Sequence, residues 1–144
     1  MFADFYLNIE LFHPEAVMPK RAISGDAGLD LFVCEKTALE PDVLISVHTG
    51  IKIEFPAGYA AIIKEKSGLA LKEIEIKAGV IDHEYRGEIV VLAKNKSKDI
   101  ITLLQGQKIA QILIVPVWIG EPNLVNKVNE DTDRKDGGFG STGF

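Results

Sequence analysis

Cysteine is almost absent from this sequence, since Cys34 is the only one among 144 residues. A single thiol cannot form an internal disulfide, and it excludes a structural metal site built from paired cysteines. No run approaches the roughly 18 apolar residues of a membrane-spanning helix. Residues Met1–Phe5 carry an acid and no long apolar stretch, so we expect no secretory signal. We therefore expect a cytoplasmic protein, or a nuclear or virion-associated one if its source is eukaryotic or viral, with no membrane partner.

Positive charge is also scarce. Lys and Arg number 16 against 21 Asp and Glu, which gives a formal net charge of −5. A protein that binds a nucleic-acid backbone needs a basic stripe, so we expect no nucleic-acid partner. A small polyanionic ligand would require local cations, backbone donors or a metal ion that overcome the overall negative field.

Apolar residues, 47% of the chain, alternate with polar ones at a period of two over many short segments. Turn residues separate the segments, and only Ser67–Lys72 reads as a helical turn. The predicted strands are Phe5–Phe12, Val43–Thr49, Ile51–Phe55, Tyr59–Lys64, Glu73–Lys77, Glu88–Asn95, Ile100–Leu104 and Lys108–Val117. Many short strands with regular turns predict an all-β fold, a jelly-roll-like or distorted β-barrel of short antiparallel strands.

The composition changes near residue 120. Residues 121–135 are polar, and the sequence ends in Gly-Gly-Phe-Gly-Ser-Thr-Gly-Phe. Such a segment cannot bury enough apolar area to order itself. We therefore divide the chain into a core, residues 1–120, and a flexible glycine-rich arm, residues 121–144, which is either dispensable or folds onto something else.

The arm contains a G-x-G-x-x-G pattern over residues 138–143. A dinucleotide fingerprint must follow a strand and open a helix, and the printed sequence offers no helix after this pattern. Glycine-rich backbone can nevertheless approach phosphate oxygens closely, while Ser141 and Thr142 add hydroxyl donors and Arg134 adds a planar guanidinium. Phe139 would be an odd residue to expose unless it stacks on something flat. The alternative is a floppy tail without a function.

Residues Ala78–Glu88 are typical of a hairpin that places polar groups beside an aromatic ring. Asp82 follows the apolar Val80–Ile81, where burial and neighbouring groups can adjust its pKa for general-base work. The alternative is an ordinary acidic turn in which Asp82 or Glu84 pairs with Arg86. Spacing alone favours that alternative.

Two further segments offer groups that suit phosphate. Residues Lys64–Ala70 bring a cation, a hydroxyl and a glycine to a strand end, and Gly106–Gln111 open a strand with two amides and a cation. Gln111 lies among apolar residues, and a buried amide needs hydrogen-bond partners. Each segment is also compatible with an ordinary charged turn.

Taken in order, these segments resemble the five motifs of the trimeric dUTPase family. The matching stretches are Ala27–Leu31 (AGLDL), Lys66–Ala70 (KSGLA), Gly79–Gly87 (GVIDHEYRG), Gly106–Gln111 (GQKIAQ), and Arg134 with Gly137–Gly143 (GGFGSTG). The third and fifth are the most specific. The resemblance implies a homotrimeric hydrolase that cleaves dUTP to dUMP and pyrophosphate with Mg²⁺, lowering dUTP and supplying dUMP for dTMP synthesis.

The resemblance also implies roles in the hairpin. Asp82 would be the catalytic general base, activating a water that attacks the α-phosphorus. Tyr85 would lie under the deoxyribose and leave no room for a 2′-hydroxyl. The backbone of Gly79, Val80 and Ile81 would bind the uracil edge and reject the amino group of cytosine.

Phosphate and metal roles follow in the same way. Ser67, Gly68 and Gln111 would hold the α- and β-phosphates, with Lys66 adding positive charge. Mg²⁺ would sit mainly on the triphosphate and keep waters, as it usually does. Asp30 would be an outer-shell or structural partner of the metal.

In the arm, the resemblance implies that Arg134, Ser141 and Thr142 clamp the γ-phosphate within glycine-rich backbone that includes Gly140. Phe139 would close over the base. Because each site in the family draws on three subunits, the arm would complete the active site of a neighbouring subunit.

The sequence departs from the family pattern at several positions. Leu29 stands where an aromatic is usual, and Lys66 and Lys108 stand where arginine is usual, which keeps charge but removes bidentate phosphate recognition. Lys135–Asp136 follow Arg134 where a glycine commonly comes first. These departures leave substrate affinity open.

Two other functions stay open at this point. A dCTP deaminase on the same fold would need an acid/base group beside the ring and a different hairpin sequence. A non-catalytic nucleotide-binding module would have no use for a base. The sequence Ile81–Gly87 favours dUTP hydrolysis over both.

Overall fold

A computed structural model describes residues 4–143. Residues 1–3, which belong to the segment examined for a secretory signal, and Phe144, the last residue of the predicted arm, lie outside the described residues. In chain order the elements are β1 (Asn8–Leu11), β2 (Leu29–Phe32), β3 (Thr37–Leu39), β4 (Leu44–His48), β5 (Ile51–Glu54), β6 (Tyr59–Lys64), α1 (Ser67–Ala70), β7 (Ile74–Lys77), β8 (Val80–Ile81), β9 (Val90–Asn95), β10 (Ile101–Leu103) and β11 (Lys108–Pro116).

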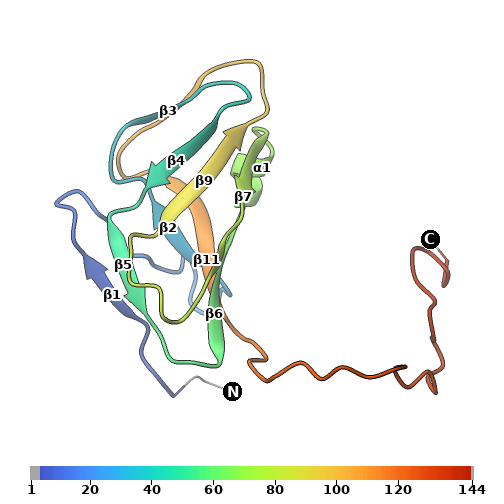
Figure 1. Cartoon of the computed structure of the whole chain (residues 1–144). Coiled ribbons are helices and arrows are strands. Elements are labelled where there is room, and N and C mark those ends of the chain that lie inside the picture. The colour runs from blue at the N-terminus through green and yellow to red at the C-terminus, as the bar shows by residue number, and fades with distance from the viewer. Residues whose placement is uncertain (1–3, 144) are drawn as a thin grey trace.

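These strands form four small sheets packed into one body (Figure 1). The strand orders are β1-β5, β10-β3, β2-β11-β6-β8 and β4-β9-β7, and every pair of these strands is antiparallel. The predicted all-β class and its short antiparallel strands are therefore confirmed. Within residues 4–143 the sheets stay separate and do not close into a barrel.

The long strand β11 organises the four-stranded sheet. It pairs with β2 on one side and β6 on the other, so Gln111 lies opposite both Asp30 and Lys64. Strand β8 pairs with β6 and forms one edge of the sheet. One sheet therefore positions the first, second, third and fourth motif segments relative to each other.

The core is built from the inward faces of the strands. In β9, burial alternates at a period of two, with Val91, Ala93 and Asn95 buried, as the sequence alternation predicts. Residues Leu31–Cys34, in contrast, are all buried. Both faces of this stretch are covered, so its sequence shows no alternation.

The structure contains all eight predicted strands, with ends shifted by a few residues, and the predicted helical turn is α1. Sequence reasoning missed three strands. Strand β2 lacks alternation because it is buried on both faces. Strands β3 and β8 have three and two residues, too few for a period to be visible.

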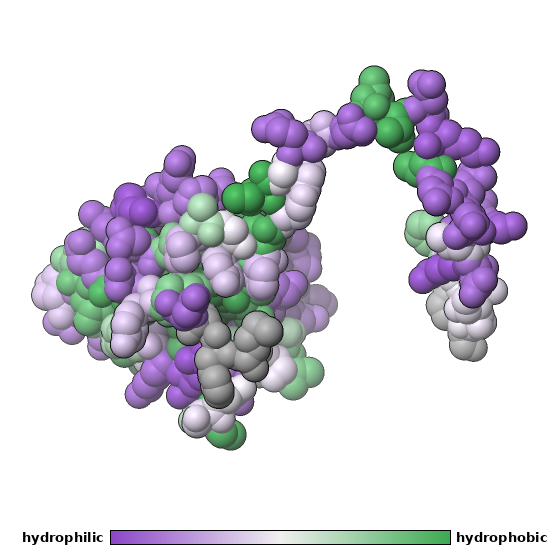
Figure 2. All heavy atoms as spheres, turned by 90° about the horizontal axis from the view of Figure 1, so that it is seen from below, coloured by the Kyte–Doolittle hydropathy of each residue, from purple (hydrophilic) through white to green (hydrophobic). Residues whose placement is uncertain are grey.

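Beyond β11 the chain leaves the sheets. Residues 117–143 contain no helix or strand and run away from the body (Figure 1). Figure 2 shows this arm as a mostly hydrophilic segment that stands apart from the body. The stretch between β11 and the arm is exposed and apolar, at Trp118 and Ile119. Among the described residues, no helix is long and apolar enough to cross a membrane.

Candidate active site

A pocket of about 230 Å³ lies beside the hairpin that joins β7, β8 and β9. Four residues named from the sequence line it: Gly79, Val80, Ile81 and Tyr85. The chain turns from β7 into β8 through two residues with positive φ, Ala78 at 55° and Gly79 at 108°. This turn brings the predicted base-binding backbone and the predicted sugar-binding ring to one pocket.

Gly79 requires glycine for two reasons. Its φ of 108° lies where side chains are rarely accommodated, and a Cβ would lie 2.8 Å from the carbonyl oxygen of Ile63. The carbonyl of Gly79 also accepts a hydrogen bond of 2.8 Å from the Ile63 N–H. The turn is therefore held tightly against β6.

Strand β8 presents a free edge. Its inner edge pairs with β6, with Ile81 opposite Ala61 and Val80 opposite Ile62. Within the described structure no strand pairs with its outer edge. A sheet edge carries unpaired backbone N–H and C=O groups. This backbone can therefore bind a planar ligand whose rim carries both donors and acceptors.

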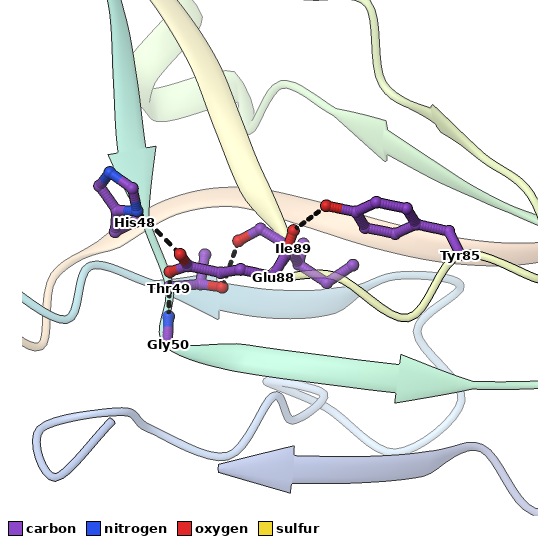
Figure 3. Close-up of polar contacts among 6 residues, drawn as sticks. All are labelled: His48, Thr49, Gly50, Tyr85, Glu88 and Ile89. Carbon is purple, nitrogen blue, oxygen red and sulfur yellow. Dashed lines mark hydrogen bonds and ion pairs between the residues drawn. The ribbon is translucent and has the colours of Figure 1, made fainter. Parts of the chain in front are cut away.

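The ring of Tyr85 is fixed by its hydroxyl group, which donates a hydrogen bond of 2.8 Å to the carbonyl oxygen of Glu88 (Figure 3). The hydroxyl also packs on Gly87, where an added Cβ would overlap it. The close contact and the hydrogen bond together define where the ring lies in the pocket.

Asp82 follows β8 directly and is exposed. Its carbonyl accepts a hydrogen bond of 3.1 Å from the Tyr85 N–H, so a tight turn holds the two residues close together. Arg86 does not form the ion pair with Asp82 or Glu84 that the alternative reading expects. Its guanidinium lies 3.7 Å from the carboxylate of Glu54 instead. The carboxylate of Asp82 therefore stays open to solvent and to a ligand in the pocket.

A second group of predicted residues surrounds a buried carboxylate, that of Asp30. The Lys66 ammonium donates a hydrogen bond of 2.5 Å to Oδ1, and the Lys108 ammonium lies 3.0 Å from Oδ2. That second contact lacks hydrogen-bond geometry, and Oδ2 accepts no hydrogen bond within the described structure. Burial acts to raise the pKa of Asp30, but the hydrogen bond from Lys66 and the close positive charges of both lysines outweigh it and lower the pKa.

Gln111 connects this cluster to the predicted phosphate loop. Its side-chain amide donates a hydrogen bond of 2.8 Å to the carbonyl of Glu65, just before Lys66. Gly28 lies against Gln111 so closely that an added Cβ would overlap the amide oxygen. Ser67 and Gly68 are exposed at the start of α1. The fold thus gathers Asp30, Lys66, Ser67, Gly68 and Gln111 at one end of β6 and β11.

The arm residues form a third group, away from the first two. Arg134 donates a hydrogen bond of 2.6 Å to the carbonyl of Gly137, so its visible contact is local. Phe139 is fully exposed and has a φ of 51°. The other predicted arm residues are also exposed: Gly140, Ser141 and Thr142.

Within one chain, the three groups of residues do not form a common pocket. The hairpin pocket is lined by none of the predicted phosphate residues and by none of the described arm residues, 121–143. A ligand that contacts all three groups would need more than one copy of the chain, or a large movement of the arm.

Comparison with known proteins identifies the family of this chain. The profile of the dUTPase family matches residues 14–143. The chain belongs to the dUTPase family. The deoxyuridine 5'-triphosphate nucleotidohydrolase of Hydrogenobaculum sp. is 43% identical over 142 residues, which cover 96% of this chain and 98% of that protein.

Solved dUTPase structures share the fold. The dUTPase of Staphylococcus bacteriophage 80alpha with dUPNHPP has a TM-score of 0.85 and 28% identity, covering 96% of this chain and 99% of that one. A mutant dUTPase from phage phi11 of S. aureus, described with a structural Mg(II) ion, has a TM-score of 0.79 and 27% identity. That comparison covers 85% of this chain and 98% of the phi11 chain.

The dUTPase motifs did not point to Glu88, a residue of the pocket, or to the side chain that contacts it. Glu88 lines the pocket, and His48, from β4, contacts the Glu88 carboxylate. The available sequence signal was weak: an acid directly after the third motif and a histidine at the end of a predicted strand. Only the pairing of β4 with β9, which places His48 opposite Val90, brings them together.

Proposed function

We propose that the protein is a dUTP diphosphatase that hydrolyses dUTP to dUMP and pyrophosphate. The observation that carries this proposal is the hairpin pocket, in which a free backbone edge, Gly79–Ile81, lies beside the ring of Tyr85. The exposed carboxylate of Asp82 follows this edge. The Hydrogenobaculum relative is named for the same hydrolysis.

The pocket suits recognition of deoxyuridine. Uracil offers two carbonyl oxygens and one N–H along its rim, and the edge backbone of Gly79–Ile81 offers complementary groups. Cytosine carries an amino group in place of one acceptor, which would leave backbone groups unpaired, and unpaired buried polar groups are costly. Tyr85 lies under the sugar, where its ring would leave no room for a 2′-hydroxyl.

Asp82 acts as the general base. It takes a proton from a water that attacks the α-phosphorus, the bond from that phosphorus to the bridging oxygen breaks, and pyrophosphate leaves. Such a step needs positioning and a base rather than a covalent intermediate on the protein. Because the Asp82 carboxylate is exposed and not paired with Arg86, it is available to hold that water.

Positive potential for the triphosphate comes from the cluster around Asp30. Lys66 lies beside Ser67 and Gly68, whose exposed hydroxyl and backbone can bind phosphate oxygens. Asp30 holds the Lys66 ammonium in place. Gln111 supports the loop from the opposite side. An overall acidic protein can bind a polyanion in this way because the cations are concentrated locally.

Mg²⁺ fits this site as a companion of the substrate. No group of three His, Cys, Asp or Glu side chains in residues 4–143 could hold a metal ion, whereas Mg²⁺ commonly binds through substrate phosphates and retained waters. Asp30 Oδ2 keeps acceptor capacity for a metal-bound water, and the nearby Lys108 ammonium disfavours direct contact with a cation. When bound, Mg²⁺ neutralises phosphate charge and polarises the reacting group.

We also propose a homotrimer in which each site is shared. The hairpin pocket, the phosphate cluster and the arm are separate in one chain, and neighbouring subunits would bring them together. Arg134, Ser141 and Thr142 of one arm would clamp the γ-phosphate in a neighbour's site, with Gly140 giving close backbone approach and Phe139 covering the base. Light scattering at micromolar concentration should return the mass of three chains; a stable monomer would contradict shared sites.

One assay separates this function from its rivals. Purified protein with dUTP and Mg²⁺ should release pyrophosphate, whereas dCTP should yield neither pyrophosphate nor ammonia. Ammonia from dCTP would indicate a deaminase, and binding of dUTP without turnover would indicate a non-catalytic module. An intracellular location, where dUMP feeds dTMP synthesis, belongs to the same proposal.

A further inference from the structure

The segment that follows the hairpin is anchored to the turn between β4 and β5 (Figure 3). The carboxylate of Glu88 has both oxygens engaged: Oε1 lies 2.9 Å from Nδ1 of His48, and Oε2 accepts the N–H of Gly50 at 2.9 Å. The hydroxyl of Thr49 donates to the carbonyl of Ile89 at 2.5 Å. The last residue of β4 and the two residues after it therefore hold Glu88 and Ile89, which lead into β9.

The contacts of Glu88 are charge-assisted and partly shielded from water. Its side chain is 22% exposed and that of His48 is 42% exposed. A carboxylate oxygen accepts hydrogen bonds, so the form of His48 that carries a proton on Nδ1 completes this contact. Hydrogen bonds to a charged acceptor are stronger than neutral ones. The position of Glu88 is therefore well defined.

Glu88 in turn defines the position of Tyr85. Its main-chain carbonyl accepts the hydrogen bond of the Tyr85 hydroxyl, and Glu88 lines the same pocket. His48 and Gly50 hold the side chain of Glu88 while the main chain of Glu88 holds the ring of Tyr85. A continuous series of contacts thus leads from β4 to the ring.

We infer that Glu88 and His48 are positioning residues that fix the Tyr85 ring and thereby set the discrimination between deoxyribose and ribose. The inference rests on the proposed role of Tyr85 under the sugar. Excluding one hydroxyl group requires a rigid surface, because a small displacement of a positioning group is enough to change a bound geometry. A ring released from the Glu88 carbonyl gains freedom to move and makes room for a 2′-hydroxyl.

A purely structural role would have different consequences. If the pair only joined the β4–β5 turn to the sheet, its loss would lower stability and would reduce activity on dUTP and UTP alike. The ratio of kcat/KM for dUTP to that for UTP separates the two roles, because it does not depend on the fraction of folded protein.

The test uses two variants, Glu88→Gln and His48→Asn. The glutamine keeps the shape of Glu88 but leaves one oxygen acceptor for two donors. For each variant, kcat and KM are measured with dUTP and UTP, together with the melting temperature. We expect the dUTP/UTP ratio to fall about three- to tenfold, the size of one hydrogen bond, with the change in KM larger than that in kcat. If Glu88→Gln does not fold, His48→Asn decides alone, because His48 is half-exposed.

Asp42→Asn is the matched control. It removes an ion pair of 2.7 Å with Lys96 at the opposite end of the β4–β9 pair, and its ratio should equal that of the parent. Ratios in Glu88→Gln and His48→Asn that match the control would overturn the inference. Tyr85→Ala tests the proposed role of Tyr85 itself. If its dUTP/UTP ratio equals that of the parent, Tyr85 does not discriminate between the two sugars, and both that role and the inference fail. If Tyr85→Ala changes the ratio but the Glu88 and His48 variants do not, only the inference fails.

Discussion

Asp82 stands where the chain leaves the free edge of β8, and no arginine neutralises its carboxylate. We predict that Asp82→Asn, which keeps the shape but cannot take a proton, lowers kcat by about 10²–10⁴-fold, the usual range for a positioned base. Pyrophosphate release measures kcat, and calorimetry with a non-hydrolysable dUTP analogue should show retained binding. Glu84→Gln, which alters the exposed acid two residues away, is the control. Near-normal turnover in Asp82→Asn would place the base elsewhere.

Asp30 shows how a buried acid can support a cationic site. Its pKa is lowered in the folded protein by the two lysines, so the folded state holds the proton more weakly than the unfolded chain does. Asp30 therefore contributes stability above its ordinary pKa of about 3.9, and this contribution is lost as the pH falls below it.

We predict that Asp30→Asn lowers the free energy of unfolding at pH 7 by about 1–3 kcal/mol, the value of hydrogen bonds to a charged group. The difference from the parent should begin to narrow below about pH 4, where the unfolded chain takes up a proton at Asp30, and it should keep narrowing until the folded protein takes up that proton as well. Thermal unfolding at several pH values measures this. Asp133→Asn, which changes an exposed acid of the arm, should follow the parent at every pH. If the difference in free energy of unfolding between Asp30→Asn and the parent does not change with pH, the two lysines do not stabilise an ionised Asp30.

At the scale of elements, the turn from β7 into β8 sets the shape of the pocket. Gly79→Ala adds a Cβ to a residue with φ of 108° and brings it to 2.8 Å from the Ile63 carbonyl. Gly58→Ala is the matched control, because Gly58 has φ of 91° but nothing within 4 Å of the added atom. An alanine at positive φ lowers the free energy of unfolding of each variant by about 1–2 kcal/mol.

We predict that Gly79→Ala loses more stability than Gly58→Ala and also raises KM for dUTP, because β8 must move away from β6. Denaturant unfolding and steady-state kinetics measure the two effects. Equal losses of stability and unchanged KM in both variants would show that the close approach of Gly79 to β6 does not shape the pocket.

The same elements show what the sequence could and could not predict. Alternation identified strands with one covered face, such as β9, but not β2, whose residues Leu31 and Phe32 are both buried. Motifs three and five gave the pocket residues and the arm through resemblance to the dUTPase family. The contact between His48 and Glu88 depends on strands 40 residues apart, and no local pattern encodes such a pairing.

For the whole molecule, the separation of three residue groups in one chain is the central fact. Residues from β8, from the loop before α1 and from the arm cannot meet in one monomer while the arm extends away from the body (Figure 1). The proposed cyclic trimer would bring these groups together, because a closed symmetric assembly repeats the same contact at every interface. The apolar residues just before the arm, Trp118 and Ile119, are exposed in the single chain and are available to such an interface.

The glycine-rich segment from Arg134 onward gives the sharpest test of that assembly. Its visible hydrogen bonds are local, such as those of Ser141 to Gly138 and Gly143 to Gly140. Ordering such a segment costs on the order of 1–2 kcal/mol per residue. Contacts of Arg134 and the hydroxyls with the γ-phosphate, and stacking of Phe139, must offset that cost. We therefore expect the segment to become ordered when a dUTP analogue and Mg²⁺ bind. It should stay largely mobile with dUMP, which lacks the γ-phosphate.

We predict that deletion from Arg134 onward leaves the proposed trimer and its melting temperature nearly unchanged, because none of residues 134–143 belongs to the core. Turnover of dUTP should nevertheless collapse, since the phosphate clamp and the cover that excludes water are lost together. Light scattering, thermal unfolding and pyrophosphate release measure the three quantities on one preparation. Arg134→Ala in the full-length chain is the companion variant and should lose part of the activity. A truncated trimer that keeps most of its turnover would refute the proposed roles of Arg134, Phe139, Gly140, Ser141 and Thr142.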